Sequence, residues 1–182
     1  STAADIGAKP RAHEASRRAV DEAIVRRGLD ARREAGIDPT WHRVRHRIRS
    51  RPEVTVIIPT RDRVELLAPC IELLHQQVAH APLEILVVDN ESTDPATLAY
   101  LADLPGRVVR YPHRFNYARQ MNLAAIEARG EVLLLLNNDA RPVGSEWFDA
   151  MLEHVLRAEV GAVGARLRFP DGRPQHEGVV LN

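Results

Sequence analysis

Cysteine, lysine and long apolar runs are scarce in this sequence. Cys70 is the one cysteine among 182 residues, so an internal disulfide is excluded and a reducing compartment is favoured. Its neighbours Leu67, Ile71 and Leu74 recur at helical spacing, which favours a buried helix residue over a nucleophile. No apolar run approaches the roughly 18 residues that span a bilayer, and we see no signal-peptide core. We therefore expect no transmembrane segment and a cytoplasmic location, with the inner face of the membrane as an open alternative.

An excess of charge of either sign is also missing. The 25 basic and 25 acidic residues balance, so no overall positive field draws in nucleic acid. Locally, residues 40–52 ("TWHRVRHRIRSRP") mix arginine and histidine with apolar side chains. An RNA contact and a solvated face whose apolar side packs on the domain are both open interpretations, and we favour the second. No nucleic-acid partner is predicted.

Three common phosphate-binding and catalytic motifs are absent. The sequence has no Gly-x-Gly-x-x-Gly dinucleotide fingerprint and no Gly-rich P-loop. It has no Gly-x-Ser-x-Gly elbow, which argues against a serine hydrolase. Without a glycine cradle, a phosphate ligand needs a metal ion to neutralise its charge, and Mg²⁺ or Mn²⁺ takes the oxygen ligands that proteins supply.

Two regions differ in composition and pattern. Residues 1–50 are rich in Arg, Glu and Ala, and their spacing predicts one or two amphipathic helices that end at Gly28 or Gly36. From residue 51 to residue 182, apolar runs alternate with helical patterns. We therefore expect a basic, helical extension over residues 1–50 and one α/β domain over residues 51–182.

The second region is predicted to alternate strands with helices. Strands are expected at residues 54–58, 83–88, 107–111, 132–136 and 160–167. Asp94, Asn116 and Ser145 are expected to cap helices, and residues 169–182 to form a hairpin around Pro-Asp-Gly. Continuously apolar strands are buried on both faces. The predicted fold is an open, mostly parallel, Rossmann-like α/β sheet with helices on both faces.

Polar residues directly follow three of the predicted strands. In open α/β sheets, ligands bind beyond the carboxyl ends of the strands, where such side chains converge. Each group could instead cap a helix or a turn, but capping explains three strand ends less well than one. A carboxylate with an amide oxygen is also a partial shell for a hard cation. The groups are Pro59-Thr60-Arg61-Asp62, Asp89-Asn90-Glu91-Ser92 and Asn137-Asn138-Asp139.

Five segments, in this order, resemble family 2 glycosyltransferases, the inverting, nucleotide-sugar-dependent enzymes of the GT-A fold. They cover about residues 52–181 and read "VTVIIPTRDR", "EILVVDNESTD", "FNYARQMNLAAIEARGEVLLLLNND", "WFDAMLEHV" and "VGAVGARLRFPDGRPQHEGVV". The pieces "NND" and "DGRPQHEGVV" resemble the bacterial branch that builds polysaccharides, O-antigens and related cell-surface glycans. The resemblance implies a hexosyl- or related transferase that uses a nucleotide-diphosphate sugar and a glycan or lipid-linked acceptor.

The resemblance also implies roles for residues of the nucleotide pocket. Thr60 and Asp89 would line it, with Asp89 accepting a hydrogen bond from the base, and Glu91 lies in the same loop. Arg119 lies in the helix from which relatives offer an arginine toward the nucleotide. This chain reads Ala-Arg-Gln-Met-Asn where the family often reads Ala-Arg-Asn.

Asn137-Asn138-Asp139 occupies the Asp-x-Asp position of the family. The resemblance implies that Asp139 binds a divalent Mn²⁺ or Mg²⁺ ion and that Asn137 and Asn138 face the donor. Because one carboxylate holds a cation less strongly than two, we expect weak metal binding without nucleotide. His176 is a further candidate for a metal or phosphate partner, although a hairpin histidine that only packs explains it equally well.

Inversion needs a general base for the acceptor hydroxyl. The resemblance implies that this base is an Asp or Glu that follows an acceptor-side segment, and we expect it beyond Asn182. No base is therefore assigned, and little turnover is expected from these 182 residues alone.

A sugar-phosphate nucleotidyltransferase is disfavoured because residues 59–62 are not its Gly-rich, Arg-bearing loop. A non-catalytic nucleotide-binding or protein-interaction module of the same fold stays an alternative.

Overall fold

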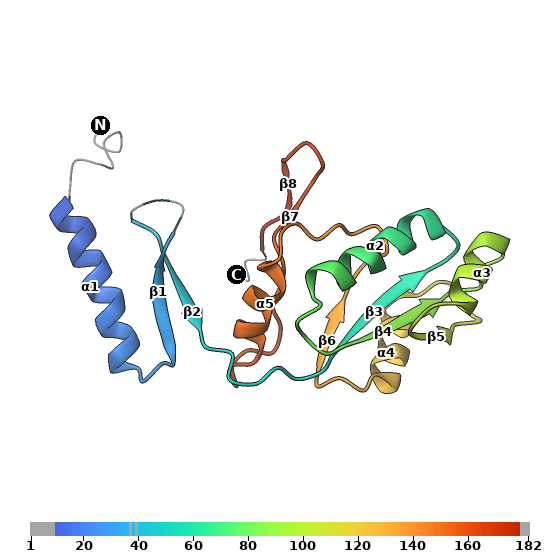
Figure 1. Cartoon of the computed structure of the whole chain (residues 1–182), viewed down its shortest axis with the longest axis horizontal. Helices are drawn as coiled ribbons and strands as arrows, with labels where there is room; N and C mark the ends of the chain where they lie inside the picture. Colours follow the sequence, from blue (N-terminus) through green and yellow to red (C-terminus); the bar gives the residue numbers. More distant parts are fainter. Residues whose placement is uncertain (1–9, 37, 39, 179–182) are drawn as a thin grey trace. The chain divides into compact units, whose positions relative to one another are not determined.

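The chain forms two compact units in a computed structural model that describes residues 10–36, 38 and 40–178 (Figure 1). The first unit comprises Ser1–Arg49 with Asp149–Asn182, and the second comprises Ser50–Phe148. Among the described residues, no helix combines the length and the apolar character that crossing a bilayer requires. The three polar strand ends identified above all belong to the second unit.

A four-stranded parallel sheet forms the centre of the second unit. Its strands lie in the order β5-β4-β3-β6 and all three neighbouring pairs are parallel, which confirms the predicted open sheet. β3 and β4 are buried along almost their whole length, as expected for continuous apolar runs. The strands are β3 (Val54–Thr60), β4 (Leu83–Asp89), β5 (Arg107–Arg110) and β6 (Val132–Leu135).

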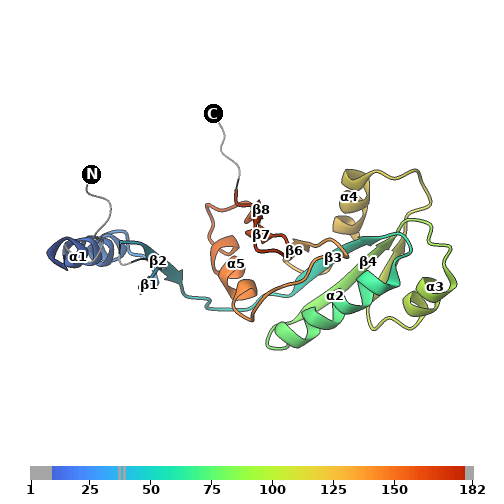
Figure 2. The same cartoon turned by 90° about the horizontal axis from the view of Figure 1, so that it is seen from above.

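Helices cover both faces of this sheet, as predicted. α2 (Val64–Gln77) and α3 (Pro95–Ala102) lie on one face, and α4 (Tyr117–Glu127) lies on the other (Figure 2). Successive residues of β3 point to opposite faces of the sheet. Val56 therefore packs in the apolar core under α2 and α3, and Ile57 packs in the apolar core under α4. Fully burying each such side chain contributes about 1.5–3 kcal/mol, and these two cores hold the strand ends in place.

Two of the three predicted helix caps are confirmed. The Asp94 carboxylate accepts a hydrogen bond from Thr97 N at 2.8 Å at the start of α3. The Asn116 side chain accepts one from Arg119 N at 3.0 Å at the start of α4. α5 (Trp147–Val155) begins at Trp147, so its cap position is residue 146. The third prediction, a cap at Ser145, was therefore one residue too early.

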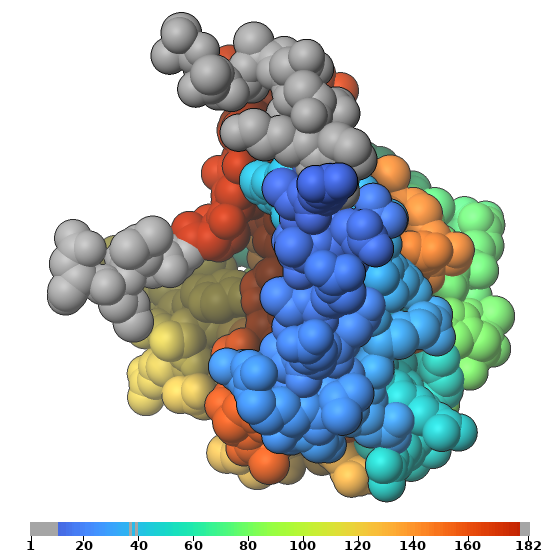
Figure 3. All heavy atoms as spheres, turned by 90° about the vertical axis from the view of Figure 1, so that its left-hand side faces the viewer, coloured from blue at the N-terminus to red at the C-terminus, as the bar shows by residue number. Residues whose placement is uncertain are grey.

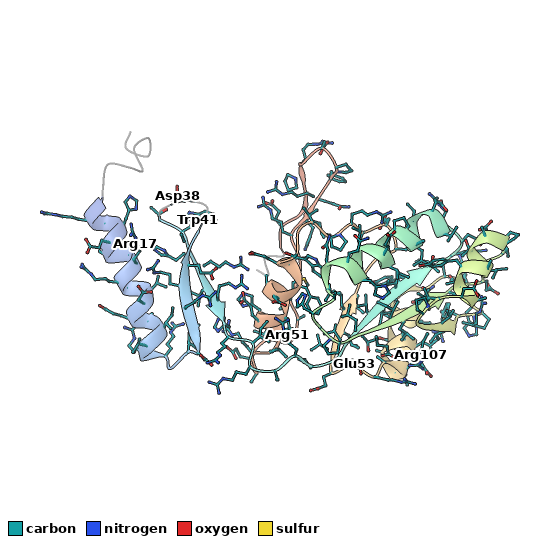
Figure 4. All side chains as sticks on the ribbon, in the orientation of Figure 1. Arg17, Asp38, Trp41, Arg51, Glu53 and Arg107 are labelled. Carbon is teal, nitrogen blue, oxygen red and sulfur yellow. The ribbon has the colours of Figure 1, made fainter. Side chains whose placement is uncertain are left out.

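An ion network at the amino ends of the strands ties the sheet to the end of α4. Glu84, which is 8% exposed, accepts hydrogen bonds from Thr55 Oγ1 (2.6 Å), Arg129 N (2.8 Å) and Arg107 Nη1 (3.0 Å). Burial raises the pKa of Glu84, but these donors outweigh it and hold the pKa below its ordinary value. Arg107, labelled in Figure 4, also donates to the exposed Glu127 carboxylate at 2.9 Å.

The first unit differs from the helical extension that we expected. α1 (Pro10–Arg26) forms as predicted, and Figure 3 shows it facing the viewer. Gly28 follows the helix in the left-handed conformation, with φ 61°. A hairpin of β1 (Ala31–Ala35) and β2 (His42–His46) replaces the second helix. One helix was among the two expected outcomes, and the second helix does not form, because arginines alternate with other residues along β2, which is the two-residue period of a strand.

Part of the arginine-rich segment packs inside this unit. Arg45 of β2 donates to the Glu153 carboxylate of α5 at 2.8 Å, and Glu153 is only 2% exposed. Arg43 lies 3.8 Å from the same carboxylate. These two arginines thus face a buried carboxylate, whereas the interpretation favoured from the sequence had the apolar side chains of the segment pack and its basic face solvated.

The predicted fifth strand was mostly wrong. Residues 160–166 form no strand, and Gly161 and Gly164 explain this because glycine weakens a strand interior. The hairpin that follows is confirmed, with β7 (Leu167–Arg168) paired to β8 (Pro174–His176) and Gly172 in the turn at φ 85°. Residues 179–182 of the predicted hairpin lie outside the described residues.

Replacing Glu84 with glutamine should lower the free energy of unfolding by about 2 kcal/mol at pH 7, because Arg107 then loses a buried charged partner. The folded-state pKa of Glu84 lies below its unfolded value, so its stabilisation is present at neutral pH and is lost as pH falls through the folded pKa. Urea unfolding at pH 7 and pH 3 measures both effects, and the difference between the two proteins should be smaller at pH 3 than at pH 7.

Glu127→Gln is the matched control, because that carboxylate contacts the same arginine but is 45% exposed. It should cost less than about 1 kcal/mol. Equal losses in the two variants at pH 7 would show that burial of Glu84 contributes nothing.

Candidate functional site

The ends of β3, β4 and β6 meet at the carboxyl edge of the sheet. Thr60 is the register partner of Asp89, so the last residues of β3 and β4 lie side by side. Leu136 N donates to Ile57 O at 3.0 Å and extends the ladder beyond β6. Asn138 Nδ2 then donates to Thr60 Oγ1 at 3.1 Å. The structure thus brings together one predicted residue from each of the three strand ends.

Asp89 is fully buried and has two partners. Its carboxylate accepts hydrogen bonds from Ser92 N at 3.1 Å and from the Arg110 guanidinium. Arg110 is the register partner of Asp89 on β5, and its side chain is 58% exposed. The Arg110 contact is thus the one made by an exposed side chain, and the Ser92 contact is made by the backbone of the adjoining loop.

The loop after β4 is held by Asp62 from the loop after β3. Asp62 Oδ1 accepts hydrogen bonds from Thr93 N (2.7 Å) and Asp94 N (2.8 Å), and Asp62 N donates to Ser92 Oγ (2.7 Å). Asp62 and Glu91 both have positive φ, at 53° and 60°, so each loop turns sharply at its strand end. Asp62 therefore holds the loop after β3 and the loop after β4 together. The Glu91 side chain, in the second of these loops, is exposed to solvent.

The segment after β6 presents oxygen donors to solvent. Asn137 and Asp139 are exposed, and Ala140 N donates to Asn137 O at 3.1 Å to close a turn. The Asp139 carboxylate makes no hydrogen bond or ion pair with any residue that the structure describes. Over the described ranges, no group of three or more His, Cys, Asp and Glu side chains could hold a metal. A cation here would have one carboxylate and neighbouring amide oxygens, which are hard ligands that suit Mg²⁺ or Mn²⁺.

The remaining predicted residues lie in different places. Arg119 is exposed in the first turn of α4, next to the buried Gln120. His176 is exposed in β8 of the first unit, so it is not among the residues that the second unit gathers. Cys70 is buried in α2 as predicted, and burial raises the pKa of its thiol to about 11, which excludes a reactive thiolate at neutral pH.

Sequence reasoning missed one residue that contacts Asp89 and one that contacts the next residue, Asn90. Arg110 ends the short strand β5, and a basic residue at the end of a strand next to Asp89 was the available signal. Gln120 is 1% exposed, and its Nε2 donates to Asn90 Oδ1 at 3.0 Å. Its signal was weaker, because a polar residue early in a helix is normally solvated.

Comparison with known proteins agrees with this geometry. Residues 55–178 match the family described as Glycosyl transferase family 2. The chain is 41% identical over 167 residues to the O-antigen biosynthesis protein RfbC of Myxococcus xanthus, covering 90% of this chain. It is 37% identical over its full length to the uncharacterized protein y4gI of Sinorhizobium fredii (strain NBRC 101917 / NGR234). The chain spans 13% and 21% of the length of these two relatives.

A solved structure is also similar, that of the mannosyltransferase PcManGT from Pyrobaculum calidifontis in complex with GDP-Man and Mn²⁺. The TM-score is 0.54 at 26% identity, over 87% of this chain and 45% of that chain. The parallel sheet with helices on both faces agrees with the GT-A fold of that neighbour. From the family match, the fold and the converging strand ends, the chain belongs to glycosyl transferase family 2.

Proposed function

We propose that the second unit binds a nucleotide-diphosphate sugar at the carboxyl ends of β3, β4 and β6, for transfer of the sugar to an acceptor hydroxyl with inversion. The observation that carries this proposal is the convergence of Thr60, Asp89 and Asn138, which the strand register and one side-chain hydrogen bond bring together. Family membership supports sugar transfer as the chemistry.

Relatives support the biological setting and the donor class. The name of the Myxococcus relative refers to O-antigen biosynthesis, which supports a role in bacterial polysaccharide or cell-surface glycan synthesis with a glycan or lipid-linked acceptor. The similar solved structure holds GDP-Man, a nucleotide-diphosphate sugar. Such donors fit the cytoplasmic location expected from the sequence.

The base of the nucleotide would lie beside Asp89. The buried Asp89 carboxylate is a strong hydrogen-bond acceptor, so a ring N–H of the base can replace the Arg110 guanidinium as the donor. The displaced Arg110, together with the exposed Arg119, would then be free to face the negative diphosphate. Thr60 and Glu91 lie at the ends of the same two strands, where we place the nucleoside.

Asp139 is the residue that we propose to hold the divalent cation. It is an exposed carboxylate, and Asn137 and Asn138 add amide oxygens beside it. Diphosphate oxygens would complete the shell, and the bound ion would stabilise negative charge on the leaving diphosphate. Mn²⁺ in the similar solved structure supports this assignment. His176 belongs to the first unit, and its role as a metal or phosphate partner stays a prediction from the sequence alone.

Asp139→Ala should abolish metal-dependent nucleotide binding, because it removes the one carboxylate at this strand end. Calorimetric titration with UDP, GDP and dTDP, with and without Mn²⁺, measures the effect. We expect Mn²⁺ to strengthen binding at least tenfold in the wild type, which corresponds to about 1.4 kcal/mol, and to have no effect in the variant. Asp103→Ala, which removes another exposed carboxylate of the second unit, is the control. A folded wild type that binds none of the nucleotides would contradict the proposal.

Asn137→Asp should change the order in which metal and nucleotide bind. A second carboxylate at the strand end strengthens the electrostatic hold on a cation, so Mn²⁺ should bind this variant without nucleotide, and the wild type should bind it only weakly. Titration of both proteins with Mn²⁺ alone checks this. Equal affinities would show that residue 137 does not face the ion.

A further inference from the structure

A chain of amide hydrogen bonds lies one residue beyond Asp89 and has no place in the site described so far. Asn90 is 2% exposed and Gln120 is 1% exposed. Asn90 N donates to Thr60 O at 2.9 Å and so continues the ladder between β3 and β4. The Asn90 side chain forms hydrogen bonds with residues after β5 and with α4.

Backbone carbonyls decide the orientation of both amides. Asn90 Nδ2 donates to Tyr111 O (3.1 Å) and to His113 O (2.8 Å), which uses both of its hydrogens. Asn90 Oδ1 is therefore the atom that faces α4, and it can only accept. Gln120 must present its NH₂ group there, and Nε2 donates at 3.0 Å. Neither amide can be flipped without placing two acceptors or two donors face to face.

Together with the buried side chains of Met121 and Ala124, this link holds the rotation of α4 about its own axis. Gln120 lies in the first turn of the helix, one position after Arg119. Successive residues are about 100° apart around a helix with 3.6 residues per turn. Gln120 and Met121 both point inward, and Arg119 lies about 100° and 200° from them around the helix, so it projects outward, and its side chain is exposed. The bond from Gln120 to Asn90 thus links the outward position of Arg119 to the strand end that carries Asp89.

We propose that the Asn90–Gln120 pair is a positioning device of the nucleotide site, which holds Asp89 and Arg119 in one fixed arrangement. The proposal rests on the proposed function, because it takes the nucleotide to bind at these strand ends. Neither amide contacts the ligand. Both are positioning residues, and they act by holding the start of α4 and the end of β4 together.

A carboxyl group at position 120 tests the direction of the hydrogen bond. In Gln120→Glu the ionised carboxylate has no hydrogen to donate and faces Asn90 Oδ1, so two acceptors oppose each other. The protonated carboxyl group can donate its O–H and restore the link, and burial favours that neutral form. Nucleotide binding by this variant should therefore improve as pH falls.

Other titratable groups around this position are shared with the wild type. They are Asp89 with its partner Arg110, Tyr111 and His113 on the side of the sheet, and Arg119 on α4 itself. All of these groups are present in both proteins. The ratio of variant to wild-type affinity at each pH therefore isolates residue 120.

The experiment is calorimetric titration of the wild type and of Gln120→Glu with UDP, GDP and dTDP in the presence of Mn²⁺, at pH 8 and pH 5.5. We expect at least a tenfold loss of affinity in the variant at pH 8 and at least a threefold smaller loss at pH 5.5. Gln120→Leu, which cannot donate at any pH, should show the same loss at both. Gln76→Glu, exposed on α2, is the control and should bind as the wild type does.

Urea unfolding of each variant, measured in parallel, separates positioning from general destabilisation. Folded variants at position 120 that bind nucleotide as tightly as the wild type would overturn the proposal. So would a loss in Gln120→Glu that is equal at both pH values. If Gln120→Glu does not fold, Gln120→Leu decides by the size of its loss. A wild type that binds no nucleotide would instead overturn the proposed function, and this inference with it.

Discussion

The parallel pairing of β3 with β4 is the constraint on which the candidate site depends. It places Thr60 opposite Asp89, so two polar residues from distant parts of the chain share one edge of the sheet. β6 pairs with the other side of β3 and carries Asn138 to the same edge. A slip of one residue in either pair would turn its side chains to the opposite face and separate this group.

The two ends of the same sheet have different physical roles. At the amino ends, the buried Glu84 joins three strands and the end of α4 through hydrogen bonds and ion pairs. At the carboxyl ends, buried polar residues such as Asp89 and Asn90 hold the loops, while Asp139 stays exposed and unpaired among the described residues. Buried hydrogen-bonded residues that hold exposed candidate groups in place are the arrangement that precise binding requires.

Much of this fold could be predicted because its signals are local. The strands of the second unit are continuous apolar runs, and the caps Asp94 and Asn116 precede their helices directly. The hairpin of β1 and β2 was missed because helix-forming residues are common in its sequence, and strand pairing overrode their preference. For the candidate site, residue type and position directly after a predicted strand indicated Thr60, Asp89 and Asn138, and the structure brings these three together, while their roles stay predictions. Arg110 and Gln120 depend on the register of β5 and the rotation of α4, which no local pattern reveals.

The central claim, that a nucleotide binds at the carboxyl ends of β3 and β4, can be tested without turnover. Backbone amide chemical shifts of the ¹⁵N-labelled chain, recorded with and without UDP or GDP and Mg²⁺, locate the ligand directly. We predict the largest changes at residues 60–62, 89–92 and 137–139, and little change at Glu84 and Arg107 at the opposite ends of the strands. Changes confined to those amino ends or to the first unit would contradict the account.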